Sequence, residues 1–128
     1  MCNCPNKYFI CQVCGNLVEL VRSGGGTLVC CGQPMSELTP NTVDASKEKH
    51  VPVITVSGDQ ATVAVGSVPH PMTEEHHISF VVLKTDAGLQ RQCLCVGGEP
   101  KAVFALGGAK PVAALAYCNL HGLWLANA

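Results

Sequence analysis

The sequence predicts an all-β protein with two domains, a small metal-stapled domain at residues 1–38 and an antiparallel β-sandwich at residues 39–128. Two observations lead to this prediction. Cysteine and glycine punctuate the first part of the chain, whereas the second part repeats short runs rich in valine, isoleucine and alanine. Between the two parts, the segment 38–49 (LTPNTVDASKEK) is polar and contains Pro40 and Asn41, so we interpret it as a linker.

The first domain is predicted to depend on a metal ion. Its apolar pieces are short and lie at Tyr8–Ile10, Leu17–Val21 and Thr27–Val29. Pieces of this size cannot bury enough apolar surface to offset the entropy of ordering the chain. A structural metal would supply the missing stabilisation, because its binding free energy becomes folding free energy.

Four cysteines form the first candidate site. Cys11 and Cys14 precede Gly15, which permits the turn that aims both thiolates at one ion. Cys30 and Cys31 complete a set of four soft ligands. A lone CxxC pair is typical of a chance pair or a redox dithiol, but adjacent cysteines rarely form a disulfide with each other, so the full set favours a metal site. These ligands alone do not distinguish iron from zinc.

Seven short apolar runs predict the strands of the sandwich. Turn residues such as Gly58-Asp59 and Gly107-Gly108 separate several of them, as expected for antiparallel strands. The runs lie at 51–56, 61–66, 76–84, 89–96, 101–106, 112–118 and 123–126. The run 112–118 (VAALAYC) is ambiguous, because its alanines would suit a helix equally well.

Composition and charge restrict the function. Of the 128 residues, 48% are hydrophobic and 13% are charged, and the net charge is −1. This balance leaves no basic surplus for binding nucleic acid or an anionic membrane. No apolar run approaches the roughly 20 residues that a membrane-spanning helix requires, and Met1–Ile10 shows no export signal. We therefore expect a cytoplasmic protein, in which the nine cysteines more often bind metal than form disulfides.

Histidines and a further cysteine form the second candidate site. Cys118 and His121 have a spacing that is common among metal ligands, and prolines stiffen the backbone after His50 and around His70. With His76, this imidazole-rich set suits iron, copper or zinc. The Cys–His pair could instead be the nucleophile and base of a thiol hydrolase, but that alternative leaves the other histidines unexplained.

Six short motifs follow one another in a distinctive order. They are CQVCG at 11–15, CCG at 30–32, EKHVP at 48–52, HPM at 70–72, EEH at 74–76 and YCNLHG at 117–122. In this order the motifs resemble those of desulfoferrodoxin, the two-iron form of superoxide reductase, over nearly the whole chain. The resemblance implies a desulforedoxin-like first domain and an immunoglobulin-like sandwich.

The resemblance also implies two iron ions per chain and their ligands. The first iron would be bound by Cys11, Cys14, Cys30 and Cys31. The second, catalytic iron would be bound in a plane by His50, His70, His76 and His121, with Cys118 as the axial ligand. Glu48 and Lys49 would flank the open sixth position of this iron.

The activity that the resemblance implies is the one-electron reduction of superoxide to hydrogen peroxide. Rubredoxin or a similar carrier would donate the electrons, and the protein would be a homodimer. Without the resemblance, we would interpret Glu48 and Lys49 as a solvated pair in the linker. Two alternatives stay open: a rubredoxin-like electron-transfer protein whose second metal is structural, and a zinc-stabilised binding module without a redox role.

The chain departs from the family pattern at one histidine. His77 follows His76 where the family often has an aromatic residue. Strand alternation would place His76 on the face of Ile78 and Phe80, and His77 on the opposite face. We therefore predict that His76 is the ligand.

Four cysteines have no role in the family pattern. They are Cys2, Cys4, Cys93 and Cys95. They form two CxC pairs, which could bind a third metal, but free thiols are the favoured interpretation in a reducing compartment.

Overall fold

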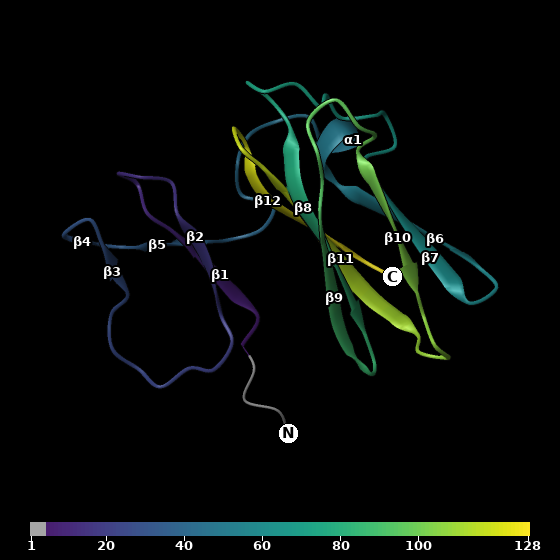
Figure 1. Ribbon diagram of the computed structural model, residues 1–128, viewed down its shortest axis with the longest axis horizontal. Helices are drawn as coiled ribbons and strands as arrows, with labels where there is room; N and C mark the ends of the chain where they lie inside the picture. The colour runs from purple at the N-terminus through teal and green to yellow at the C-terminus, as the bar shows by residue number, and fades with distance from the viewer. Residues whose placement is uncertain (1–4) are drawn as a thin grey trace. The chain divides into compact units, whose positions relative to one another are not determined.

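The structure of the protein is a computed structural model that describes residues 5–128 (Figure 1). Its contacts divide the chain into two compact units, one that ends at Thr39 and one that spans Pro40–Ala128. Strands and turns build almost all of both units, so the all-β prediction is confirmed. Across residues 5–128, no helix combines the length and apolar character needed to cross a membrane. Cys2 and Cys4 lie outside the described residues.

The first unit consists of two small antiparallel sheets. A three-stranded sheet has the order β2-β1-β5, and a two-stranded ribbon pairs β3 with β4. The strands are β1 (Lys7–Ile10), β2 (Leu17–Leu20), β3 (Val29–Cys30), β4 (Gln33–Pro34) and β5 (Ser36–Leu38). Among the described residues of this unit, Tyr8 and Cys11 are the only buried hydrophobic side chains. The unit therefore has very little apolar core.

The second unit is a sandwich of two antiparallel sheets (Figure 1). One sheet has the order β10-β7-β6 and the other the order β12-β11-β8-β9. The strands are β6 (Pro52–Ser57), β7 (Gln60–Val65), β8 (Ile78–Thr85), β9 (Gly88–Cys93), β10 (Lys101–Ala105), β11 (Pro111–Cys118) and β12 (Gly122–Asn127). Each of the seven predicted runs forms a strand, including the ambiguous run 112–118.

The chain passes between the two sheets in the manner of an immunoglobulin-like sandwich. It pairs β6 with β7, crosses to β8 and β9, returns to place β10 beside β7, and crosses again to place β11 and β12 beside β8. The core between the sheets is apolar. Ala61, Val63 and Val65 of β7 contribute their inward faces to it, and so do Ala116 and Cys118 of β11. The predicted fold class is confirmed.

A short helix, α1 (Lys47–His50), begins in the predicted linker, ends one residue beyond it, and was not foreseen from the sequence pattern. The backbone N–H of Val51 donates to the carbonyl of Lys47 at 2.9 Å and closes its single turn. One turn is too short to produce a helical repeat of apolar residues, so no periodic pattern predicted this helix. This turn presents His50 to the sandwich.

Strand β8 contains a bulge near its start. Its register on β11 shifts between the pairs Phe80–Tyr117 and Ile78–Cys118, so Ser79 is opposite no residue of β11. The extra residue reverses the alternation, because Ile78 belongs to the core whereas Phe80 stacks on Tyr117. The alternation argument for His76 was therefore wrong, since β8 begins only at Ile78 and the bulge places Phe80 on the other face.

Candidate metal centres

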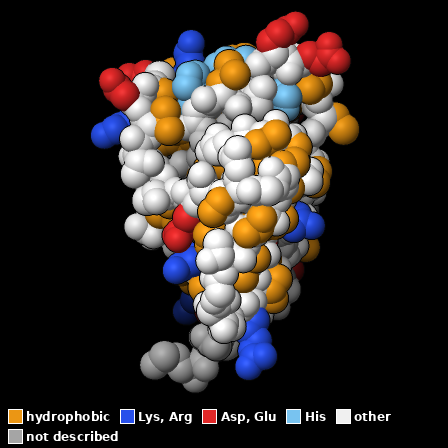
Figure 2. Space-filling model, turned by 90° about the vertical axis from the view of Figure 1, so that its left-hand side faces the viewer, with side chains coloured by type: hydrophobic (Ala, Val, Ile, Leu, Met, Phe, Trp, Pro, Cys, Tyr) orange, Lys and Arg blue, Asp and Glu red, His pale blue; other side chains and the backbone are white. Residues whose placement is uncertain are grey.

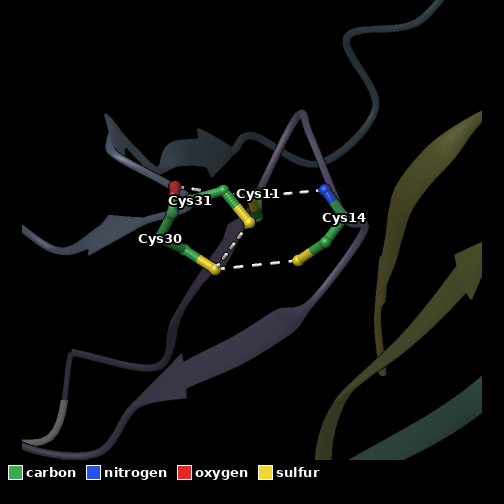
Figure 3. A group of neighbouring side chains, drawn as sticks. All are labelled: Cys11, Cys14, Cys30 and Cys31. Carbon is green, nitrogen blue, oxygen red and sulfur yellow. Dashed lines mark hydrogen bonds between the residues drawn. The ribbon is translucent and has the colours of Figure 1, made fainter.

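The four predicted cysteines of the first unit lie together (Figure 3). Their Sγ atoms all lie within 4.8 Å of one another. The Sγ atoms of Cys14 and Cys30 are 3.7 Å apart, and those of Cys30 and Cys31 are 4.0 Å apart. Four sulfurs bonded tetrahedrally to one metal at about 2.3 Å would be separated by about 3.8 Å. The spacing therefore fits a single tetrahedral ion.

Left-handed backbone positions produce this arrangement. Gly15 has a φ of 80° and ends the turn that brings Cys11 beside Cys14. Cys31 itself has a φ of 53°, and Gly32 follows at 73°. A non-glycine residue rarely adopts this conformation, which costs on the order of 1–2 kcal/mol. It turns the side chain of Cys31 toward the same point as that of Cys30.

The thiols favour a bound cation. Backbone N–H groups of Cys14 and Val13 lower the pKa of Cys11 to about 6. The neighbouring thiols, first that of Cys14, raise the pKa of Cys31 to about 12, and the thiol of Cys11 raises that of Cys30. One thiolate therefore forms readily and opposes the ionisation of its neighbours. A metal cation would remove this opposition, because it stabilises every thiolate that it binds.

The second set of predicted ligands gathers at the end of the sandwich that carries α1 (Figure 1). His50 is the last residue of α1, and His70 and His76 lie in the loop between β7 and β8. Cys118 is the last residue of β11, and His121 lies in the turn that leads into β12. At this end, which is at the top of Figure 2, histidine side chains reach the surface among lysine and acidic side chains.

The four imidazole rings stand at the corners of a quadrilateral. Neighbouring rings, in the order His50, His70, His76, His121 and back to His50, have centroids 4.7, 4.5, 5.1 and 4.9 Å apart. The diagonal between His50 and His76 is longer, at 6.2 Å. The ligand atoms of His50, His76, Cys118 and His121 all lie within 4.8 Å of one another, and His70 completes the ring without meeting that limit for every member.

The hydrogen bonds of two rings determine which nitrogen can bind a metal. Nδ1 of His50 lies 2.6 Å from the carbonyl oxygen of Ser46, and Nδ1 of His70 lies 2.7 Å from that of Pro71. A carbonyl oxygen only accepts, so Nδ1 carries the proton in both rings and Nε2 of the neutral ring carries a lone pair. The backbone thus orients both rings with Nε2 toward the centre.

These nitrogens lie at the distances expected around one ion. Nε2 of His50 lies 3.2 Å from Nε2 of His70 and 3.1 Å from Nδ1 of His121. Two nitrogens bonded at about 2.1 Å in adjacent positions of a square would be about 3.0 Å apart. In His50 and His70 the two lone pairs face each other, which is unfavourable unless a cation lies between them. The chemistry of this donor set therefore fits a metal.

Burial favours the neutral form of three of the rings. It lowers the pKa of His70 to about 4 and also lowers the pKa values of His50 and His76. Nε2 of His76 is buried and has no hydrogen-bond partner in the structure. Burial also raises the pKa of the Cys118 thiol, although two backbone N–H groups donate to its sulfur and oppose this effect. An unpartnered nitrogen and a buried thiol at one point need a cation to be satisfied.

Close backbone packing positions the first two histidines. A Cβ atom at Gly66 would lie only 2.5 Å from the carbonyl oxygen of Glu48, so the segment after β7 passes directly against α1. The N–H of Val68 donates to that same carbonyl at 2.9 Å. The N–H of His70 donates to Val65 at 2.8 Å. A larger residue at position 66 would therefore push α1, and with it His50, away from His70.

Two supporting residues were missed by sequence reasoning. The side chain of Asn119 accepts a hydrogen bond from the N–H of His77 at 2.8 Å and donates to the carbonyl of Glu75 at 2.9 Å, so it holds the segment that carries His76. Trp124 stacks on His50, with ring centroids 5.0 Å apart, and donates to the carbonyl of His121 at 3.1 Å. The hydrogen bonds of Asn119 and the stacking of Trp124 on His50 join segments that are distant in sequence, so no local motif indicated them.

The remaining predicted residues lie outside the ring of imidazoles. Nδ1 of His77 lies 3.0 Å from the carbonyl of Thr73, and its ring takes no part in the cluster. Glu48 and Lys49 are exposed on α1, and the hydroxyl of Ser46 donates to the Glu48 carboxylate at 2.8 Å. The charge of Lys49 adds a smaller contribution to the lowered pKa values of His50 and His76, so its field reaches the cluster.

An immunoglobulin-like sandwich with four imidazoles and a buried thiol at one end, preceded by a four-cysteine unit, defines a protein with two metal centres. The sequence profile of the desulfoferrodoxin family matches residues 42–127, and that of its N-terminal domain matches residues 5–38. The chain belongs to the desulfoferrodoxin family. The predicted pair of iron ions per chain agrees with this membership and with the two donor sets.

Related proteins support the same assignment over nearly the full length. The desulfoferrodoxin of Nitratidesulfovibrio vulgaris (strain Hildenborough) is 48% identical over 97% of this chain and 99% of its own. A protein of Pyrococcus horikoshii named superoxide reductase is 38% identical over 70% of this chain and 94% of its own. The crystal structure of the superoxide reductase from Treponema pallidum matches with a TM-score of 0.80 at 39% identity, over 94% of this chain and 98% of that one.

Proposed function

We propose that the chain is a superoxide reductase that converts superoxide to hydrogen peroxide at an iron bound by His50, His70, His76, His121 and Cys118. One observation carries the proposal. Four imidazoles surround a point that a buried thiol also reaches, and a lysine stands exposed beside it. The relatives named superoxide reductases add to its support.

The reaction combines superoxide with one electron and two protons to give hydrogen peroxide. Bound iron would supply the electron, and the thiolate of Cys118 would raise the electron density available for transfer. The chain supplies the rest. Lys49 attracts the anion with its positive charge and orients water that delivers a proton. Glu48, on the same turn, would shield the bound metal and be displaced when the anion arrives.

The four-cysteine centre is proposed to receive electrons. Cys14 and Cys31 are exposed, so an electron carrier can approach their sulfurs closely. We propose rubredoxin or a similar one-electron carrier as the donor and a homodimer as the working assembly, both on the strength of the family resemblance. The domain boundary, with residues 1–38 bearing the first iron and 39–128 the second, also belongs to this proposal.

Product stoichiometry tests the proposed reaction. The iron-loaded, pre-reduced protein is exposed to a superoxide source while peroxide and dioxygen are measured. A reductase yields one peroxide for each superoxide consumed and no dioxygen, whereas dismutation releases dioxygen as well. Peroxide without dioxygen is the expected result. Failure to consume superoxide, with both irons present, would favour the electron-transfer alternative instead.

A further inference from the structure

Two thiols outside both metal centres lie on one face of the chain. Cys93 is the last residue of β9, Cys95 begins the following turn, and both are exposed free thiols. Leu94, which lies between them, packs against the hydrophobic core. Because side chains alternate along an extended chain, Leu94 points inward while Cys93 and Cys95 both point outward.

The backbone places these two thiols at the outer limit for a disulfide. In an extended chain the α-carbons of residues two apart are about 6.6–6.8 Å apart. This separation is at the upper end of the range that disulfides span, about 4.4–6.8 Å. The chain also bends just after this point, because the N–H of Gly98 donates to the carbonyl of Cys95 at 3.1 Å. Closure of a disulfide therefore requires the chain between Cys93 and this turn to shorten.

The pair lies at the metal end of the sandwich. Cys93 pairs with Phe80, near the start of β8, where Ile78 pairs with Cys118. The N–H of Gly97 donates at 2.8 Å to the carbonyl of Met72, in the loop that carries His70 and His76. Figure 1 shows the connection from β9 to β10 at the same end as α1. Peroxide released from the histidine site would therefore emerge at the same end of the sandwich as these thiols.

We propose that Cys93 and Cys95 form a dithiol that hydrogen peroxide oxidises to an intramolecular disulfide. The proposal rests on the proposed function for its source of peroxide. One thiolate attacks an oxygen of the peroxide, and the O–O bond breaks to give a sulfenic acid and, after protonation, water. The second thiol then attacks the sulfenic sulfur, forms the S–S bond and releases a second water. Peroxide is reduced by two electrons, and the two thiols supply them.

The same chemistry is blocked at the other described cysteines. Cys118 is completely buried, so peroxide in solution does not reach it. Cys11, Cys14, Cys30 and Cys31 are the proposed ligands of the first iron, and metal coordination occupies their sulfurs. Within residues 5–128, Cys93 and Cys95 are therefore the thiols that combine exposure with freedom from a metal. A thiol reductant returns the pair to the dithiol state. The oxidation is therefore reversible, and it reports peroxide produced at this end of the molecule.

Peptide mass mapping tests the proposal on the intact protein. The iron-loaded, oxidised protein is treated with hydrogen peroxide, alkylated and digested with trypsin. Cleavage after Arg91 and Lys101 releases the peptide 92–101 (QCLCVGGEPK), which contains both thiols and no other cysteine. We expect this peptide to lose the mass of two hydrogen atoms and to take up no alkyl label. Reduction before alkylation should restore two labels.

Variants and alternative products make the test decisive. Cys95→Ser and Cys93→Ser should each abolish the closed peptide while both metal centres keep their absorption spectra. Two retained labels after peroxide treatment, over-oxidation without closure, or cross-linking of this peptide to another peptide would each overturn the proposal. Because peroxide is added directly, the result does not depend on superoxide reduction. Failure of the proposed function would thus be seen in the stoichiometry assay and not here.

Discussion

The two metal-binding regions of the molecule differ in how much folded structure surrounds their ligands. In the first unit, the ligands lie in turns or at the end of strands of two to four residues, and the described part contains almost no apolar core. In the second, the ligands lie on loops and strand ends at one edge of a seven-stranded sandwich with an extensive core. The number of donors is similar, but the structure that surrounds them is not.

This difference indicates whether the metal stabilises the fold of a region or the fold positions the metal. In the first unit the metal would hold the chain, because so few side chains are buried there without it. In the second unit the chain would hold the metal, because carbonyl oxygens and an indole ring already orient the imidazoles. Loss of metal should therefore unfold the first region and leave the second region folded.

Serine substitutions at one cysteine of each region test this contrast with the largest expected effect. Cys14→Ser should abolish the first iron centre and the hydrogen-exchange protection of β1 and β2, while pre-reduced protein still reacts with superoxide. Cys118→Ser should abolish the reaction and the thiolate-to-iron absorption of the second centre, because a hard hydroxyl does not replace the thiolate. Protection of β7, β8 and β11 should persist in both variants.

Pulse radiolysis, absorption spectra and hydrogen exchange of the two variants give the answer. A Cys14→Ser protein that no longer reacts with superoxide would show that the centres do not act separately. A Cys118→Ser protein with normal turnover and its thiolate absorption intact would show that another cysteine binds the iron. Loss of protection in both regions of either variant would contradict the proposed difference in metal dependence.

Adjacent histidines provide a second test within the sandwich. His76→Ala should lose catalytic iron or activity, because the Nε2 atom of His76 is buried in the cluster without another partner. His77→Ala should keep both, because its ring bonds only to nearby backbone carbonyls. Iron content and the rate with superoxide measure the outcome. Release of iron from His77→Ala alone would move the ligand assignment by one residue.

The sequence predicted the parts of the structure that are encoded locally. The cysteine pairs at 11–14 and 30–31 each supply two donors within a few residues, and the seven strands follow from short apolar runs between turns. In each case the residues that produce the feature lie within a few positions of one another in the sequence. For the same reason the fold class could be predicted without knowledge of how the sheets pack.

Other features could not be predicted because they arise between distant segments. The bulge at Ser79 depends on the register of β8 against β11, and it reversed the alternation on which the choice of His76 was based. Asn119 contacts a loop more than forty residues earlier in the chain. A side chain at position 66 is excluded because the carbonyl oxygen of Glu48 lies directly against Gly66. Each of these contacts forms only when folding brings the distant segments together.

Asn119 offers a third test, of the idea that the chain holds the second metal. Asn119→Ala removes both hydrogen bonds to the segment that carries His76, so that segment should become more mobile. We expect iron affinity at this centre to fall by about ten-fold or more, in the range seen when supporting contacts of metal ligands are removed. The rate of iron loss to a chelator measures it, and the spectrum of the first centre serves as an internal control. Unchanged iron release would mean that the strands alone position His76.

The smallest effect is expected at Lys49, which binds no metal. Lys49→Ala should lower the bimolecular rate with superoxide by about ten-fold, within the range that electrostatic steering supplies. Rising salt should shrink the difference, because screening at roughly 0.1 M weakens exposed interactions beyond about 10 Å. Lys49→Arg should recover much of the rate, since steering requires the charge more than the group that carries it.

Measurement of the second-order rate against ionic strength for the three proteins separates steering from a structural role of Lys49. Iron content should be equal in all three, because the side chain is exposed and lies outside the ring of imidazoles. If Lys49→Arg were as slow as Lys49→Ala at every salt concentration, the residue would act through a specific hydrogen bond and not through its charge. Equal rates and equal salt slopes would instead identify Lys49 as an ordinary solvated lysine on α1. In that case the ligands of the second centre would alone account for its rate with superoxide.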